Sequence, residues 1–153
     1  MDFGFTNDPT TLVRIVLHEG KLYGELLLYQ TGMTGGDIVK FLDSIRFPKD
    51  KHIYCDNAPA TIEDMRRGGY KKARAAKKWK GCVSERIGQL NSYGYLQLVH
   101  NIHWKAEQIG YKYKENKLTG QPTNDPDDTL GLGHIWDGMG LSLIHISEPT
   151  RPY

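Results

Sequence analysis

Three aspartates occupy positions from which a fold could gather carboxylates. Asp2 is the second residue, Asp56 ends the apolar run HIYCD, and Asp137 follows His134 in GHIWDG. Because residues at i and i+3 share a helical face, His134 and Asp137 are expected side by side. If the fold brings the carboxylates together, they cannot all stay ionised without cations, and their oxygen atoms favour Mg²⁺ or Mn²⁺. Two such ions polarise a phosphodiester and activate water for in-line attack.

Each of these residues also has an ordinary structural explanation. Asp2 could be a frayed terminal residue, and Asp56 could cap the turn after its strand. Asp137 could face solvent on a helix, and His134 could orient a ligand, bind a metal or simply pack nearby. Asp8, in TNDPT, is expected to form a turn before Pro9.

A basic stretch, YKKARAAKKWKG, could hold a phosphate backbone, although a solvated charged face is the commoner explanation for a lysine run. The candidate DNA contacts are Lys72, Arg74, Lys77, Lys78 and Lys80. Phosphate contacts carry no sequence information, so little base specificity is expected. Downstream lies the acidic stretch TNDPDD. Its Asp127 and Asp128 could supply an additional acid near the site, although a solvated loop is the commoner explanation.

The composition indicates one globular domain. The chain has 153 residues, 39% hydrophobic and 25% charged, with a net charge of +2 that excludes little. It contains no apolar run long enough to span a bilayer, and its first residues lack the pattern of a secretory signal. Its two cysteines, Cys55 and Cys82, form no disulfide or zinc framework, which favours a reducing cytoplasmic compartment.

The first half of the sequence predicts strands and helices that would position Asp2 and Asp56. Residues 1–5 are expected to form a strand, followed by a hairpin in TLVRIVLHEGKLYGELLLYQ with Gly20 in its turn. A helix should follow Thr34 as N-cap, burying Ile38, Phe41, Leu42 and Ile45. The strand ending at Asp56 should lead into a helix that Thr61 caps and that Gly68 and Gly69 end.

The second half predicts the elements that would carry Asp137. A helix is expected near residues 83–91, a strand near 95–99 and a helix near 102–108. Residues 111–117 with the following LTG indicate a small hairpin. A glycine-rich segment near 130–140 is predicted to be a helix carrying His134 and Asp137.

The last thirteen residues, LSLIHISEPTRPY, are expected to be foreign to the natural protein. The in-frame translation of a transposon-end sequencing adapter matches residues 141–151 at every position. A segment of this kind contributes nothing to the fold of the natural protein. The sequence therefore predicts a domain over residues 1–140 and an artefact over residues 141–153.

Taken together, the motifs resemble the C-terminal nuclease domain of the large terminase subunit of tailed bacteriophages. The resemblance rests on MDFGFTNDPTTLVRI, KLYGELLLYQTGMTGGDIVKFL, IYCDNAPATIEDMRRGGY, KKARAAKKWKG and GHIWDG, in this order. It implies an α/β, RNase H-like fold with a mixed central sheet flanked by helices, in which the first strand and the C-terminal helix are truncated. In that family the acids that match Asp2, Asp56 and Asp137 bind the metals, and the motif histidine falls on His134.

The resemblance also implies an activity and partners. The implied activity is a two-metal DNA endonuclease, a phosphodiester hydrolase with two Mg²⁺ or Mn²⁺ ions that cuts double-stranded concatemers during genome packaging. The implied partners are an ATPase domain, the small terminase subunit and the portal, in the cytoplasm of the infected host. No GxxxxGK[ST] loop is present, so this stretch should not hydrolyse ATP. Asp2 follows only Met1, so the first strand is shortened and the isolated fragment could be inactive. As a separate departure, Gly133 stands where the family often has asparagine.

Two alternatives remain open at this point. The chain could be a non-catalytic DNA-binding or docking module of the same fold, with its acids serving as caps. It could instead be another RNase H-like enzyme, such as a Holliday-junction resolvase or a transposase. Loss of cutting on Asp56→Ala would exclude the first, and a preference for branched DNA would favour the resolvase.

Overall fold

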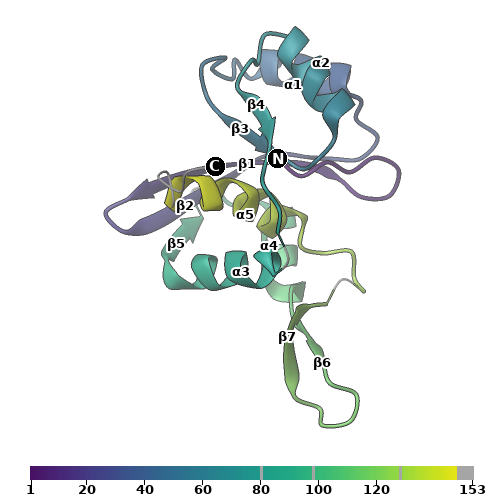
Figure 1. Cartoon of the computed structure of the whole chain (residues 1–153), viewed down its shortest axis with the longest axis vertical. Coiled ribbons are helices and arrows are strands. Elements are labelled where there is room, and N and C mark those ends of the chain that lie inside the picture. Colours follow the sequence, from purple (N-terminus) through teal and green to yellow (C-terminus); the bar gives the residue numbers. More distant parts are fainter. Residues whose placement is uncertain (80, 98, 128, 148–153) are drawn as a thin grey trace.

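The computed structural model describes residues 1–79, 81–97, 99–127 and 129–147. Helices α1 (Gly35–Ser44) and α2 (Pro59–Arg67) lie on one side of the strands, at the top of Figure 1. Helices α3 (Cys82–Ser92), α4 (Ile102–Gly110) and α5 (His134–Ser147) lie on the other side. Among the described residues, no helix combines the length and apolar character that crossing a membrane requires.

The predicted hairpin is confirmed. Strand β1 (Thr10–His18) pairs antiparallel with β2 (Lys21–Gln30), with His18 opposite Lys21. The two turn residues, Glu19 and Gly20, have φ values of 49° and 72°, as the tight turn of a two-residue hairpin requires. Strand β5 (Gly94–Gln97) then adds in parallel to the other edge of β2.

Residues 1–5 do not form the predicted strand. Asp2 makes an isolated antiparallel bridge to Thr11, with hydrogen bonds of 3.0 and 2.8 Å. The extended pairing ends there because the Thr10 hydroxyl occupies both backbone groups of Gly4, donating to its carbonyl at 2.9 Å and accepting from its amide at 3.3 Å. The chain then turns through residues 6–8.

Met1 and Asp2 join two small sheets. On one side Asp2 bonds β1, and on the other the Met1 amino group donates to the carbonyl of Tyr54. The Met1 carbonyl accepts from the amide of Asp56 at 3.0 Å. Tyr54 belongs to β3 (Ile53–Cys55), which pairs in parallel with β4 (Ala73–Ala75). Met1 and Asp2 therefore connect the sheet of β1, β2 and β5 to the sheet of β3 and β4.

The first two helices largely follow the prediction. Thr34 caps α1 in a reciprocal capping box with Asp37, and Ile38 and Leu42 are buried beneath it. Ile45, predicted to be buried, is the C-cap and is 41% exposed. The predicted cap Thr61 is wrong, because α2 begins two residues earlier, where Pro59 occupies the first helical position that suits its fixed φ. Gly68 ends this helix as predicted.

The second half also agrees, except at the last helix. Helices α3 and α4 and strand β5 lie where the pattern predicts, and β6 (Tyr113–Glu115) pairs with β7 (Pro122–Pro126) in a hairpin. Helix α5 starts at His134 rather than near residue 130, because Gly133 has a φ of 117° that no helix accommodates. It continues to Ser147, and Leu141 and Leu143 are buried. The foreign origin of residues 141–153 stays a prediction.

Two apolar clusters cover the two faces of the strands. Successive residues of a strand point to opposite faces, so Leu12 packs with α1 and α2 while Val13 packs with α4 and α5. The first cluster includes Ile38, Leu42, Ile62 and Met65, and the second includes Leu22, Trp104, Ile135 and Met139. The second cluster fixes α5, and with it the side chains of His134 and Asp137, against the sheet.

Candidate active site

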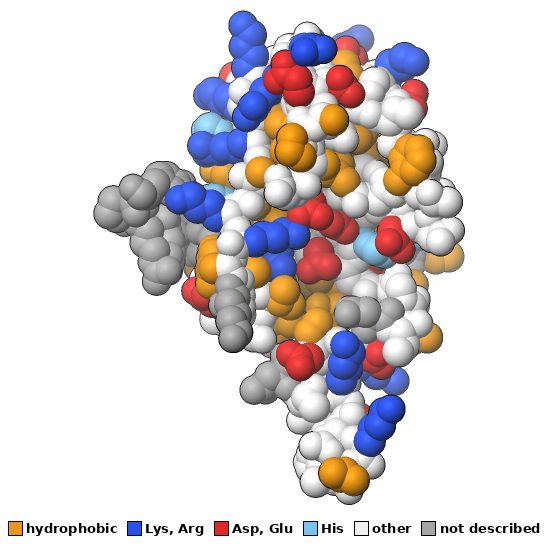
Figure 2. All heavy atoms as spheres, turned by 45° about the vertical axis from the view of Figure 1, so that its right-hand side comes forward, with side chains coloured by type: hydrophobic (Ala, Val, Ile, Leu, Met, Phe, Trp, Pro, Cys, Tyr) orange, Lys and Arg blue, Asp and Glu red, His pale blue; other side chains and the backbone are white. Residues whose placement is uncertain are grey.

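The structure brings the three aspartates to one pocket. Asp2 comes from the bridge to β1, Asp56 directly follows β3, and Asp137 lies in the first turn of α5. All three line a cavity of about 270 Å³, together with Lys78, Val83, Arg86, Tyr111, Pro126 and Leu141. On this face of the molecule, acidic, basic and histidine side chains gather near the centre (Figure 2). Segments more than fifty residues apart therefore contribute to one site.

His134 lies against Asp2. Its Nδ1 atom is 3.2 Å from Oδ2 of Asp2, and this hydrogen bond raises the pKa of His134 against the opposing effect of burial. Its Nε2 atom is buried without a hydrogen-bond partner among the described residues and faces Oδ1 of Asp8 at 3.9 Å. Asp8, predicted only to form a turn, thus contributes charge beside the site.

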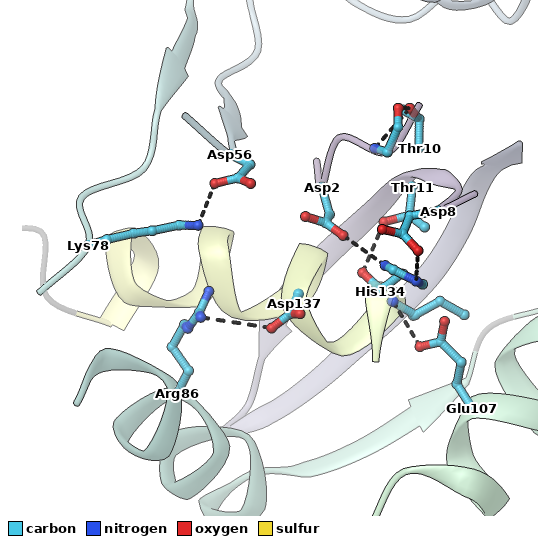
Figure 3. A network of polar contacts seen from close by, with 12 residues as sticks. Asp2, Asp8, Thr10, Thr11, Asp56, Lys78, Arg86, Glu107, His134 and Asp137 are labelled. Carbon is cyan, nitrogen blue, oxygen red and sulfur yellow. Dashed lines mark hydrogen bonds and ion pairs between the residues drawn. The ribbon is translucent and has the colours of Figure 1, made fainter. Parts of the chain in front are cut away.

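Glu107 anchors the start of α5. Its Oε2 atom accepts a hydrogen bond of 2.9 Å from the amide of Ile135, and the residue is 1% exposed (Figure 3). Burial raises the pKa of Glu107, although its backbone hydrogen bonds and the charge of His134 oppose the shift. A carboxylate at this place satisfies free amides at the N-terminus of a helix. The sequence reasoning missed Glu107, because its partner lies 28 residues away.

Asp56 is held by a local hydrogen bond and by Lys78. The amide of Asn57 donates to Oδ1 of Asp56 at 2.7 Å, and the ammonium of Lys78 forms an ion pair with the same oxygen. Burial alone would raise the pKa of Asp56, but the hydrogen bonds from Lys78 and Asn57 and the charges of Lys78 and Arg86 hold it below its ordinary value. The carboxylate is therefore kept ionised.

Asp137 has a different environment. Burial and the charge of Asp2 raise its pKa, against the lowering effects of Arg86, His134 and Lys78. One guanidinium nitrogen of Arg86 lies 3.8 Å from its Oδ1. The repulsion between Asp2 and Asp137 is the electrostatic signature of carboxylates that share a site. Arg86 was not identified from the sequence, although it shares with Cys82 and Leu90 the buried face of its helix.

Each aspartate thus lies beside a basic residue: Asp2 beside His134, Asp56 beside Lys78, and Asp137 beside Arg86 (Figure 3). The donor chemistry suits a hard divalent cation, with three carboxylates in one pocket and a buried ring nitrogen beside them. Across the described ranges, however, no three side chains of the types His, Cys, Asp and Glu are gathered closely enough to hold one metal ion. Metal binding by these residues stays a prediction.

The basic stretch is exposed and leads into the pocket. Lys72, Arg74 and Lys77 are exposed, and Lys78 extends to Asp56. The guanidinium of Arg74 lies over the ring of Tyr54, 4.8 Å from its centroid, and donates to the Tyr54 hydroxyl at 2.8 Å. Lys80 and Asp128 lie outside the described residues. Contact with DNA stays a prediction for all five basic residues.

Comparison with solved structures finds this fold in the nuclease domain of g2p, the large terminase of bacteriophage SPP1, whose crystal structure contains bound Mn. The TM-score is 0.79 over 95% of this chain and 83% of that chain, with 18% sequence identity. No family model and no curated protein matches the sequence. At this identity the similarity shows the fold, so the predicted α/β, RNase H-like class is confirmed.

Proposed function

We propose that this chain is a divalent-metal-dependent endonuclease that cuts double-stranded DNA, with phage DNA concatemers as its substrate during genome packaging. The observation that carries the proposal is the shared pocket of Asp2, Asp56 and Asp137. The fold adds support, since the SPP1 domain with the same fold is described as a nuclease with bound Mn.

In this proposal the three aspartates hold two Mg²⁺ or Mn²⁺ ions. The ions would supply Lewis-acid chemistry to the phosphodiester and its attacking water. Asp56, kept ionised, and Asp137 provide oxygen ligands from the two walls of the pocket. His134 orients Asp2 through its Nδ1 atom and can offer its buried Nε2 atom to a cation.

The basic stretch would hold the DNA backbone next to these carboxylates. Lys72, Arg74 and Lys77 are exposed, and Lys78 of the same stretch lines the pocket. Because such contacts recognise phosphate, cleavage should show little base preference. In a parent protein the domain would work with an ATPase domain, the small terminase subunit and the portal, in the cytoplasm of the infected host.

The proposal is tested by comparing the wild-type chain with Asp56→Ala on linear and supercoiled duplex DNA, with Mn²⁺, with Mg²⁺ and with a chelator. We expect divalent-dependent cutting in the wild type and its loss in Asp56→Ala, while affinity for DNA is retained. Asp50→Ala is the matched control, because Asp50 is an exposed acid that pairs with its neighbour Lys51. A folded wild-type chain that binds duplex DNA without cutting it would support the docking module instead. Preferential cutting of branched DNA would support a resolvase.

A further inference from the structure

Arg86 is a buried, positively charged residue that lines the pocket of the three aspartates. It is 6% exposed, comes from α3 and lines the cavity. Its side chain crosses α5 at Gly140, where a Cβ atom would lie 2.8 Å from Cδ of Arg86. The glycine therefore leaves the path by which the guanidinium reaches Asp137.

Among the described residues, the pairing of Arg86 with Asp137 involves few of the N–H donors of the guanidinium group. One nitrogen faces one oxygen at 3.8 Å, near the outer limit of an ion pair. Arginine has five N–H donors in a planar fork, a shape that matches two oxygens of a phosphate. Removing such a cation from water is costly unless an anion is bound closely. The geometry leaves Arg86 able to accept a second anion in the same pocket.

The charges in the pocket indicate when that exchange would occur. Lys78 and Arg86 balance Asp56 and Asp137, and a divalent cation would compete with both for the same carboxylates. The displaced basic side chain would then lack a negatively charged partner. A DNA phosphate that enters with the cation would supply that negative charge. Of these two basic residues, Lys78 exposes 48% of its side chain at the surface and Arg86 exposes 7%. Arg86 is thus the basic residue whose side chain is already inside the pocket.

We propose that Arg86 is a catalytic residue that leaves Asp137 for the phosphate group undergoing cleavage when the divalent cation and DNA bind. This inference rests on the proposed nuclease function and adds to it a hydrogen-bond donor for the charge that develops on the phosphate. The competing explanation is that Arg86 serves only as a permanent structural partner of Asp137. The two explanations differ in their consequences for cation binding.

The test uses the full chain with Arg86→Gln and Arg86→Lys, and with Arg67→Gln as the control. Arg67 is an exposed arginine of α2 that pairs with Glu63 at 3.1 Å. Circular dichroism establishes folding, calorimetry measures Mn²⁺ affinity without DNA, and duplex binding is measured with Ca²⁺ as the probe cation. Arg86→Gln should bind Mn²⁺ as tightly as the wild type or more tightly, yet lose on the order of 100-fold in the Mn²⁺-dependent cleavage rate. Arg86→Lys should recover part of that rate.

Three results would overturn the inference. Wild-type cleavage by Arg86→Gln would exclude contact with the phosphate, and a parallel loss of Mn²⁺ affinity and cleavage would assign Arg86 a structural role. If Arg86→Gln does not fold, the same measurements are made on Arg86→Lys. Lysine keeps the positive charge but lacks the planar fork of N–H donors. If the wild type itself does not cut, the proposed function fails for this chain, and duplex affinity then decides whether Arg86 contacts the DNA phosphate. That affinity should then fall by roughly tenfold in Arg86→Gln, and full retention would overturn the inference.

Discussion

Asp2 and His134 are 132 positions apart in the sequence, and Nδ1 of His134 lies 3.2 Å from Oδ2 of Asp2. Thr11 connects the two segments. Its backbone pairs with Asp2, and its buried hydroxyl donates to the carbonyl of His134 at 3.0 Å. Strand β1 therefore fixes the start of α5 relative to Asp2, so the orientation of Asp2 depends on the C-terminal helix.

Replacing His134 should impair the site without unfolding the chain. His134→Gln removes the ring that orients Asp2, and the loss of such a supporting partner typically lowers metal affinity or activity by about 10- to 100-fold. Mn²⁺-dependent cleavage of plasmid DNA measures the effect. His18→Gln, at an exposed position in the hairpin, is the control. Unchanged cleavage by His134→Gln would show that Asp2 needs no support from this histidine.

Neutralising the basic stretch should weaken DNA binding mainly at low salt. Lys72, Arg74 and Lys77 are exposed, and each phosphate contact contributes about 0.9 to the slope of log affinity against log salt concentration. Replacing the three residues by glutamine should reduce that slope by up to about three, with no change in sequence preference. Fluorescence anisotropy over a salt series measures it. The same slope in the triple variant would place the DNA elsewhere on the surface.

Glu107 should make the stability of the chain depend on pH. Burial raises its pKa above the ordinary value of 4.5, so the folded chain retains a proton that the unfolded chain releases. The free energy of unfolding must then fall as the pH rises from 4.5 through the raised pKa. Glu107→Gln lacks this pH dependence, so its stability relative to the wild type should increase as the pH rises from about 4.5 through the raised pKa in urea unfolding experiments.

The comparison for this effect is Glu63→Gln, because Glu63 is on the outer face of α2 and pairs with Arg67. A difference between Glu107→Gln and the wild type that stays constant over the pH series would contradict the assignment of a buried, proton-retaining carboxyl to Glu107.

Two glycines should respond in opposite ways to alanine. A Cβ atom at Gly24 would lie 2.7 Å from Cη2 of Trp104, so Gly24→Ala should destabilise the chain by about 1–3 kcal/mol through overpacking. Gly88 lies within α3, with open space around its Cβ position, so Gly88→Ala should stabilise by about 0.5–1 kcal/mol through helix propensity. Urea midpoints measure both, and equal effects would refute the packing against Trp104.

Local signals in the sequence were sufficient for much of the fold. The capping box of Thr34 and Asp37, the turn at Gly20 and the position of Asp56 after an apolar strand all depend on neighbouring residues. The three aspartates line one pocket. Their joint action on a metal rests on the resemblance of their motifs to those of a known family and stays a prediction. Neither source gives the distances between side chains.

The errors arise where distant residues compete with local preference. The expected strand over residues 1–5 stops because the hydroxyl of Thr10 takes both backbone groups of Gly4. Arg86 and Asp137 meet across 51 positions, which no helical pattern reveals. The ion pair of Lys78 with Asp56 was likewise not expected from the sequence, while the assignment of Lys78 to the DNA backbone stays a prediction. These contacts determine how the carboxylates are held, and they require the folded chain.

The most direct test of the central claim is to soak crystals of the chain with Mn²⁺ and to collect anomalous diffraction data at the manganese absorption edge. If Asp2, Asp56 and Asp137 form a two-metal centre, two anomalous peaks about 4 Å apart should lie in their pocket, coordinated by the three carboxylates. Asp56→Ala should lose at least one of these peaks. A pocket without peaks, or Mn²⁺ bound only by residues outside it, would contradict the account.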